Sequence, residues 1–473
     1  MNPTIFNAKI DFVGKSDKFN LYFHQLGGIK MTSYITDLTD DLIEFAEEAE
    51  IISLNSEKID QALELSQQLN KSTQQWQIYL QLLALFGFED WLKKREPDLR
   101  IIVEKASVMQ PAYANILDVV CNLQVGEFKI CLIPTNYWSD SEVNVPRAIL
   151  DLPEFIAHFY VLVGIDETLE VAAILRFIRY DQLNSYHAQL QPQIDWTYSL
   201  EKEWFNPLPD ELLLYLQCLT PATIPLPAIP STRQAELSQI RDELATQLLQ
   251  LQSRPLWNSL SWEQGTVLLT HPELLNWLHH SNSENTPQQT TYLSDLLQIL
   301  TQQALNVGQW LQSQVNELAQ ELSWQPLPMG VFRQNLTSSS PFEASIFNEI
   351  RDNFGVEIPE EAVGAYQDIL NKIRLYPLSW SLADSQEEWT LFLIVTPIPG
   401  QPSLPEIELR ISDQTGILAE EKLDSQHNKS YLLAQIEGTY DEKFLVTITT
   451  TDGEIQVSRL FEYRNSPNSE IIN

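Results

Sequence analysis

The sequence predicts an α+β multidomain fold, with N-terminal helices packed on an antiparallel β-hairpin sheet, a helical middle section and a C-terminal β-sandwich. Three observations lead to this prediction. The 473 residues exceed one ordinary core and favour two or three domains. Hydrophobic residues make up 44% of the chain, which is enough for several cores. Helical and strand periodicities occupy separate parts of the chain, so each part is expected to form its own kind of layer.

These periodicities divide the chain into five segments. We expect a disordered leader at 1–32, an N-terminal α/β domain at 33–220, a proline-rich linker and helical middle region at 221–325, a C-terminal β-sandwich-like domain at 326–465 and a loose tail at 466–473. The leader stands out because its lysines outnumber its two acids. The lysines are Lys9, Lys15, Lys18 and Lys30, and the acids are Asp11 and Asp17. It is either a segment upstream of the native start or a poorly ordered terminus.

Three helices are expected after the leader. The first covers residues 37–50, the second begins near Ser56 as its N-cap, and the third runs from Thr73 to about Pro97. The third helix is apolar on most sides, which is typical of a buried helix. Its basic end, Lys93-Lys94-Arg95, lies where the helix dipole favours cations. We therefore interpret this basic cluster as a helix terminus and not as a phosphate contact.

The next part of the chain has the pattern of β-hairpins. The stretch NILDVVCNLQVGEFKICLIP predicts two strands that turn near Val125-Gly126. A second hairpin is predicted from Phe155–Gly164 and Leu169–Tyr180. Its strands are apolar on both faces, so both faces are expected to be covered. These residues are therefore predicted to serve packing and not an active site.

The middle section is predicted to be helical. Prolines 221, 225, 227 and 230 form a stiff linker, and Ser231 with Gln234 predicts a capping box. A shorter helical stretch is expected from Trp262 to His280. A third helix is expected from about Tyr292, with a near-heptad leucine stripe over Leu293–Leu322. The stripe fits either a dimerising coiled coil or a helix packed within its own chain, and Gly308 favours the second.

From Gly330 onwards the sequence predicts mainly strands. A helix is expected at Pro359–Arg374, and Asp452-Gly453 is a strong hairpin turn signal. Strands recur about every ten residues, which is typical of a β-sandwich. The strand segments are WTLFLIVTPIPG, PEIELRISDQTG, KSYLLAQIEG, KFLVTITTTDG and EIQVSRLFEYR.

Several of these stretches, taken in order, resemble a known family. They are WQIYLQLLALFGFEDWL, ILDVVCNLQVGEFKICLIP, Trp138-Ser139-Asp140, VAAILRFIR, VGQWLQ, WTLFLIVTP and PEIELRISDQTG. Together they resemble a cyanobacterial family of uncharacterised proteins known as a domain of unknown function. The resemblance covers most of the chain from Met31, and Pro359–Arg374 resembles an insertion. It implies a cyanobacterial cytoplasmic protein and no site residues.

Charge and cysteine content limit the classes of partner. The net charge of −35 repels phosphate backbones and anionic membranes, so neither a nucleic acid nor a membrane is expected as a partner. The three cysteines fit a reducing compartment and not a disulfide framework. The N-terminus lacks the apolar stretch of a signal peptide, and no run in the chain approaches the length of a membrane span. We therefore predict a cytoplasmic protein.

One constellation suggests a metal-dependent nuclease. Asp118 followed by Glu127-Phe128-Lys129 resembles the way in which carboxylates bind a cation while a lysine orients water. Alternating charges that stabilise the solvated face of an exposed strand explain the same residues without a catalytic role. Neither a P-loop nor a Gly-x-Ser-x-Gly motif is present. Cys121, Cys131 and Cys218 lie in apolar stretches and are expected to be packed thiols.

We therefore predict no catalytic, cofactor-binding or metal-binding residues and no cofactor. The acids from Asp40 to Glu48 are expected to be a solvated helix face, and His279-His280 to be partners of a helix dipole. The favoured function is a non-catalytic cytoplasmic adaptor or regulatory protein that acts through contacts with a protein partner. Two alternatives remain: a nuclease-like hydrolase that uses Asp118, Glu127 and Lys129, and a structural subunit of a homo-oligomer through the Leu293–Leu322 helix.

Overall fold

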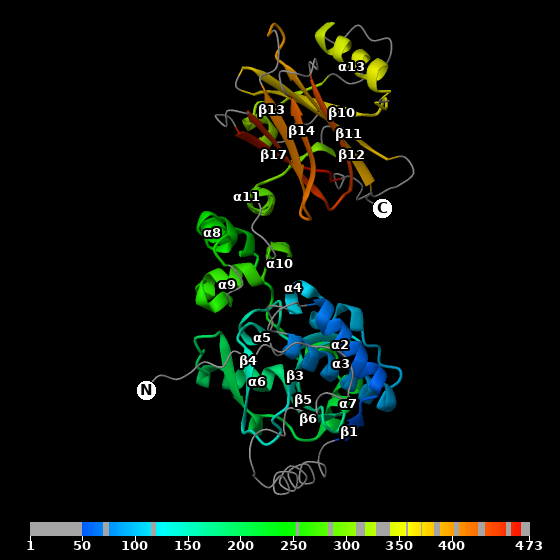
Figure 1. The fold of residues 1–473 in the computed structure, drawn as a ribbon, viewed down its shortest axis with the longest axis vertical. Helices are drawn as coiled ribbons and strands as arrows, with labels where there is room; N and C mark the ends of the chain where they lie inside the picture. The colour runs from blue at the N-terminus through cyan, green and yellow to red at the C-terminus, as the bar shows by residue number, and fades with distance from the viewer. Residues whose placement is uncertain are drawn as a thin grey trace, which may run out of the picture.

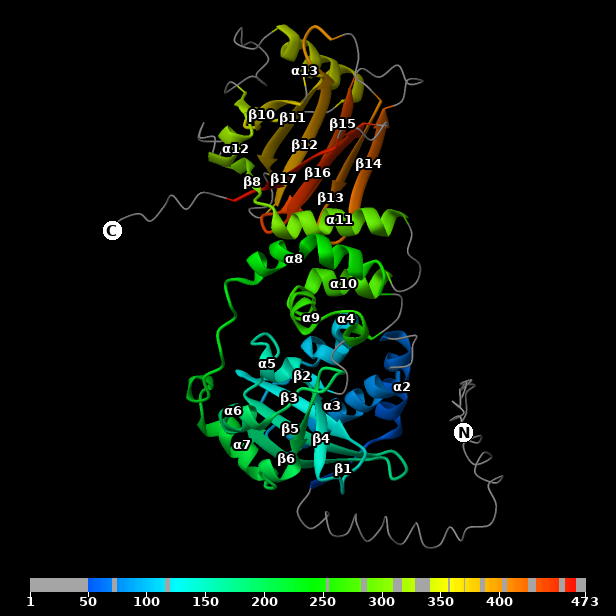
Figure 2. The same cartoon turned by 90° about the vertical axis from the view of Figure 1, so that its left-hand side faces the viewer.

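A computed structural model shows a mixed α/β protein with several sheets. It describes residues 50–69, 75–114, 120–251, 255–281, 287–308, 317–327, 341–355, 358–369, 371–382, 388–401, 406–423, 431–450 and 456–464. The N-terminal sheet, a layer of helices and two C-terminal sheets follow one another along the long axis of the molecule (Figures 1 and 2).

The N-terminal sheet has the order β1-β6-β5-β3-β2. Its strands are β1 (Glu50–Ser53), β2 (Cys121–Val125), β3 (Phe128–Thr135), β5 (Phe159–Asp166) and β6 (Val171–Arg179). Both predicted hairpins form, as the antiparallel pairs β2–β3 and β5–β6. The hairpins join through the parallel pair β3–β5, so the expectation of a purely antiparallel sheet is wrong. Residues 37–49 of the first predicted helix lie outside the described residues, and its last residue, Glu50, begins strand β1.

One face of this sheet is covered by helices α2 (Ser56–Leu69), α3 (Gln75–Arg95) and α7 (Pro209–Cys218). Helix α3 packs across β3, β5 and β6, and it is buried along most of its length, as its apolar sequence predicts. The side chain that caps α2 is Asn55 and not Ser56, because the Asn55 Oδ1 atom accepts from the Lys58 amide at 2.8 Å. At the basic end of α3, Arg95 binds Glu50 of β1, and Lys93 binds Glu89.

Gly87 sets how closely α3 approaches the sheet. A Cβ atom at this position would lie well inside van der Waals contact with the Cβ of Ala172 on β6. We expect Gly87→Ala to lower the free energy of unfolding by about 1–3 kcal/mol, since helix and strand would have to separate. Chemical denaturation measures the change, and adding Ala172→Gly is expected to restore part of it. Equal stability of Gly87→Ala and the native chain would contradict this close packing.

The opposite face of the sheet shares one core with the helical layer. That core includes the β4–β7 ribbon, formed by β4 (Glu142–Pro146) and β7 (Thr197–Glu201), and the short helices α4 (Pro111–Ala114), α5 (Ala148–Asp151) and α6 (Tyr180–Tyr186). The helical layer comprises α8 (Arg233–Leu248), α9 (Trp262–Leu269), α10 (Pro272–Ser281) and α11 (Pro287–Thr301). The sheet is therefore covered on both faces, as its apolar strands predict.

Two details of the helical layer differ from prediction. Helix α8 is preceded by Thr232 at its N-cap without a side-chain cap, so the Ser231/Gln234 box is wrong. The capping box lies instead at Ser261 with Gln264, at the start of α9. The predicted Leu293–Leu322 helix ends at Thr301, because Leu305–Asn306 form strand β8 beside β17.

The leucines of the predicted stripe that belong to α11 pack within the chain. Leu293, Leu296 and Leu297 of α11 are at most 2% exposed and belong to the core that the helical layer shares with the N-terminal sheet. Residues 309–316 lie outside the described residues. The leucines of α11 thus fit the prediction of a helix packed within its own chain.

Two five-stranded sheets form the C-terminal part, with the orders β15-β12-β11-β10-β9 and β14-β13-β16-β17-β8. Their strands are β8 (Leu305–Asn306), β9 (Gln325–Pro326), β10 (Val363–Ile369), β11 (Ile373–Ser381), β12 (Glu388–Pro397), β13 (Ile407–Ser412), β14 (Ile417–Leu423), β15 (Leu432–Thr439), β16 (Lys443–Thr450) and β17 (Gln456–Glu462). One core contains side chains from both sheets. The C-terminal part also contains helices α12 (Glu317–Glu321) and α13 (Pro341–Phe354).

The five predicted strand segments are confirmed as β12, β13, β15, β16 and β17. The helix predicted at Pro359–Arg374 is wrong, because this segment forms β10 and the start of β11. Its Ala365, Gln367 and Ile369 are all buried, which follows the two-residue period of a strand. The Asp452-Gly453 turn lies outside the described residues.

Candidate functional site

A buried ion pair holds the helical layer against the C-terminal sheets. Asp295 on α11 is 1% exposed, and its carboxylate accepts from Arg410 of β13 at 2.7 Å (Nε) and 2.9 Å (Nη2). The Ser412 hydroxyl donates to the same carboxylate at 2.7 Å. Burial alone lowers the pKa of Arg410, but the hydrogen bonds to Asp295 together with the negative charges of Asp295, Glu408 and Glu420 outweigh it and raise the pKa. Arg410 therefore stays charged, and the pair is bidentate and desolvated.

Apolar and polar contacts extend this junction. Ile299 and Ala304 share a small core with Leu445 of β16 and Leu460 of β17. The Tyr292 hydroxyl donates to the Asp413 carbonyl at 3.4 Å. Helix α11 therefore contacts both the N-terminal core and the C-terminal sheets, and it fixes one against the other.

A groove of about 600 Å³ opens beside this junction. It lies where α8, α11 and β17 meet, so its walls come from the helical layer and from a C-terminal sheet. Its lining residues are Arg241, Asp242, Ala245, Leu249, Thr290, Leu293, Ser294, Leu297, Gln298, Gln302, Gln456 and Ser458. A ligand in this groove would touch both parts at once.

The groove has the chemistry of a binding surface. Aliphatic side chains such as Leu293 and Leu297 are buried beneath it, while amides and hydroxyls surround them. Among the lining residues the ionisable side chains are Arg241 and Asp242, and they bind each other at 2.9 Å. Amide and hydroxyl groups donate and accept hydrogen bonds but do not supply acid–base catalysis near neutral pH. The lining therefore fits a polypeptide segment, which presents its own amides and apolar side chains.

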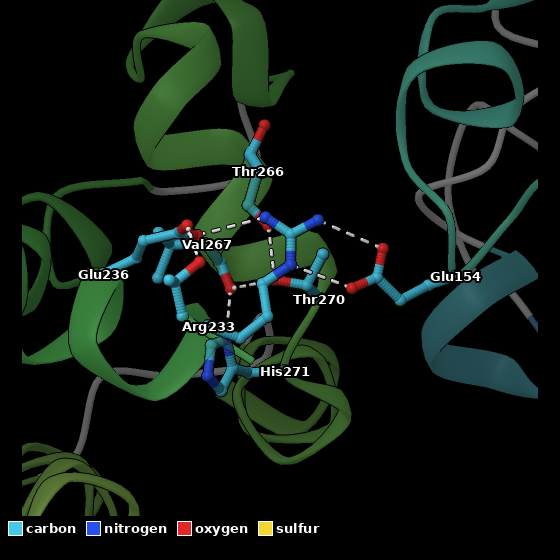
Figure 3. Close-up of polar contacts among 8 residues, drawn as sticks. Glu154, Arg233, Glu236, Thr266, Val267, Thr270 and His271 are labelled. Carbon is cyan, nitrogen blue, oxygen red and sulfur yellow. Dashed lines mark hydrogen bonds and ion pairs between the residues drawn. The ribbon is translucent and has the colours of Figure 1, made fainter. Parts of the chain in front are cut away.

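A second polar cluster connects the helical layer with the N-terminal part (Figure 3). Arg233 at the start of α8 donates to Glu154 at 2.9 Å (Nε) and 3.2 Å (Nη2), and to Glu236 at 3.0 Å. A hydrogen bond from Thr232 and the guanidinium of Arg233 lower the pKa of Glu236. Nearby, the His271 ring is hydrogen-bonded to the Val267 carbonyl at 2.6 Å. One guanidinium binds two carboxylates, one on α8 and one in the N-terminal part, so the cluster serves as a structural tie.

A third cluster is centred on Asp151, at the end of α5. Its carboxylate accepts from Arg147 at 2.6 Å and from the Tyr198 hydroxyl at 3.1 Å, and His187 lies 2.8 Å away. Burial, and then the negative charge of Asp151, raise the pKa of Tyr198. Both oxygens of Asp151 already have partners, so this cluster ties α5 to β7 and to the turn after α6.

The residues of the nuclease hypothesis do not form a site in the described structure. Asp118 lies outside the described residues. Glu127 in the β2–β3 turn and Lys129 on β3 are both exposed. The described His, Cys, Asp and Glu side chains form no group of three that could hold a metal ion. These observations give the nuclease hypothesis no support.

The cysteines and the histidine pair follow the predictions in part. Cys121 and Cys131 are buried free thiols, and burial raises the pKa of Cys121 to about 12. Cys218, however, is exposed, so its prediction as a packed thiol is wrong. His279 and His280 lie in the last turn of α10 as predicted, but burial and then the charge of His280 lower the pKa of His279, which opposes the positive form that a dipole partner needs.

Sequence reasoning missed Asp295 and Arg410, although each left a signal. Asp295 is the one acid within YLSDLLQIL, between leucines at helical spacing. Arg410 interrupts the strand IELRIS, between Leu409 and Ile411. A lone charge inside an apolar element is expected to be paired when buried. The signal predicts a partner for each residue but not that they bind each other.

Comparisons with known proteins complete the description. In the part of the chain that the structure covers, no helix is both long and apolar enough to cross a membrane. No curated protein matches this chain, and no solved structure matches it either. A family model described as protein of unknown function (DUF1822) matches residues 52–462. Since this match covers most of the sequence, the chain belongs to that family.

Proposed function

We propose that this protein is a non-catalytic adaptor or regulatory protein that acts in the cytoplasm through contacts with a protein partner. The observation that carries the proposal is the groove between α8, α11 and β17. It has the mixed amide, hydroxyl and aliphatic lining that suits a peptide, and its two ionisable side chains neutralise each other. The cyanobacterial origin implied by the resemblance belongs to the same proposal.

The proposed mechanism depends on the modules being fixed relative to one another. An α/β module, a helical connector and a β-sandwich-like module would present one continuous surface, because Asp295–Arg410 and Arg233–Glu154 hold the connector to each neighbour. A partner segment in the groove would contact the connector and the last sheet together. A preformed site of this kind loses little conformational entropy on binding. The net charge of −35 favours a partner with a basic surface and disfavours nucleic acid and anionic membranes.

A bulky side chain in the groove tests this function. The full chain, purified from cells that produce it naturally, is expected to carry a partner in near-equal amount. Ser294→Trp is expected to lower partner recovery about tenfold, because the indole would fill the space beside Leu297. Quantitative mass spectrometry of the purified complex measures the ratio of the two proteins.

Gln288→Trp is the matched control, since Gln288 is exposed on the same helix and does not line the groove. This variant is expected to keep the partner, and both variants are expected to melt at the native temperature. Recovery of the partner with Ser294→Trp would contradict the groove as its binding site. A native chain without a stoichiometric partner would contradict the adaptor function itself.

A further inference from the structure

A second surface of the N-terminal part combines exposed apolar side chains with carboxylates. We call it the acidic aromatic patch and define it by Trp76, Tyr79 and Leu169 together with Asp60, Glu167 and Glu170. Trp76 is 46% exposed and Leu169 is 54% exposed, and exposed apolar side chains are informative where they gather in one patch. The Trp76 and Tyr79 rings contact each other with centroids 5.8 Å apart.

The course of α3 along β6 brings these residues together. Gly87 lies directly against Ala172, and nearer the end of the helix Trp91 donates to Glu50, which pairs with Ile174. The helix N-terminus therefore points towards the β5–β6 turn. From Gly87 back to Tyr79 the helix covers about 12 Å. From Ala172 back to Leu169 the strand covers about 10 Å. Tyr79 thus lies beside the turn that carries Glu167, Leu169 and Glu170.

The charges around Tyr79 agree with this placement. Burial raises the pKa of Tyr79 to about 12, and the carboxylates of Glu167, Glu170 and Asp60 add to the effect in that order. Burial, and then Asp166, also raise the pKa of Glu167. A cation that approached the turn would relieve this repulsion. The indole of Trp76 offers it an apolar and cation–π contact.

From this arrangement we infer that the acidic aromatic patch binds a lysine- or arginine-rich segment of a partner protein that also carries a large apolar side chain. The basic groups pair with Glu167 and Glu170, and the apolar side chain packs on Trp76 and Leu169. A second copy of this chain is disfavoured because its net charge is also −35. The inference rests on the proposed adaptor function and adds a second contact surface, remote from the groove.

A synthetic peptide of alternating lysine and leucine with one tryptophan tests the patch. Its binding to the full chain is measured by fluorescence anisotropy at low and high salt, against the same peptide with glutamate in place of lysine. The combined variant Trp76→Ser, Leu169→Ser is expected to weaken binding about tenfold. Glu167→Gln with Glu170→Gln is expected to do the same and to reduce the salt dependence.

Two control variants distinguish binding at the patch from nonspecific attraction of the peptide to the acidic protein. Ile194→Ser removes an aliphatic side chain that is 91% exposed, and Glu420→Gln with Glu421→Gln removes two exposed charges on β14. Both are expected to leave binding within about twofold of the native chain. Equal binding by native and patch variants would overturn the inference. If the native chain were a dimer and the patch variant a monomer, the surface would be assigned to self-association, and this would also overturn the inference.

Two further outcomes complete the test. Tighter peptide binding after Lys15→Gln with Lys18→Gln would identify the chain's own leader as the occupant, and this too would overturn the inference. Loss of peptide binding in the patch variants while Ser294→Trp binds the peptide normally is the supporting result. If the patch variants bound the peptide as well as the native chain while Ser294→Trp still lost the partner, the patch would be rejected and the proposed adaptor function would remain intact.

Discussion

Asp295→Ala is expected to lower the free energy of unfolding by about 3–5 kcal/mol, because it leaves the Arg410 guanidinium buried without its counter-charge. Arg410 is 8% exposed, and its Nε and Nη2 atoms both donate to Asp295. Ser412 loses its acceptor in the same step. The junction of α11 with the C-terminal sheets should therefore open before the rest unfolds. Urea denaturation, followed separately by fluorescence and by proteolysis between α11 and β8, measures both effects.

Two controls show whether the loss comes from the buried charge. Asp242→Ala removes the acid of an exposed pair on α8, whose Asp242 side chain is 87% exposed, and is expected to change stability by less than about 1 kcal/mol. The combined variant Asp295→Leu, Arg410→Met removes both charges and is expected to recover most of the loss. If Asp295→Ala and Asp242→Ala had equal effects, the ion pair would not hold the junction.

Local periodicity predicted those elements whose pattern agrees with their packing. Helices α2 and α3 and the two N-terminal hairpins lie at the expected residues. Helix α2 repeats with the helical period, whereas α3 and the second hairpin are apolar on most sides and were located by their length and their turn signals. The helix predicted at Pro359–Arg374 was wrong because the apolar residues of this segment fit both the helical and the strand period. Pairing with β11 and β9 selected the strand. The predicted long helix ends at Thr301 because the residues of β8 pair with β17 instead of continuing the helix. In both cases contacts with distant residues decided the local structure.

The groove and the patch were beyond prediction for a different reason. Ser294, Gln298 and Ser458 are ordinary surface residues in sequence, and they acquire a shared role only when β17 returns to α11. Trp76 and Leu169 are likewise separated by most of the N-terminal part. Sequence patterns report on burial within one element and contain little information on which surfaces meet. Charge, in contrast, allowed an expectation from the start, since a net charge of −35 disfavours nucleic acid and anionic membranes as partners.

Trp389→Ala is expected to cost about 3–5 kcal/mol of unfolding free energy, because it empties the centre of the core between the two C-terminal sheets. Trp389 is fully buried on β12, and its ring lies 5.2 Å from Phe444 and 5.6 Å from Tyr463, measured between centroids. Its Nε1 atom donates to the Thr439 carbonyl at 2.9 Å. Trp389→Phe keeps an aromatic ring but loses this bond, so it is expected to cost about 1–3 kcal/mol. Thermal and chemical denaturation rank the two variants.

Trp76→Ala is the informative comparison, because it removes the same side chain from the acidic aromatic patch. Trp76 is 46% exposed and has no place in either N-terminal core, so its replacement is expected to cost less than about 1 kcal/mol. A large indole that contributes little to stability but remains in contact with solvent is available for binding. If Trp76→Ala destabilised the protein as strongly as Trp389→Ala, Trp76 would be a structural residue, and the patch would lose the apolar half of its binding surface.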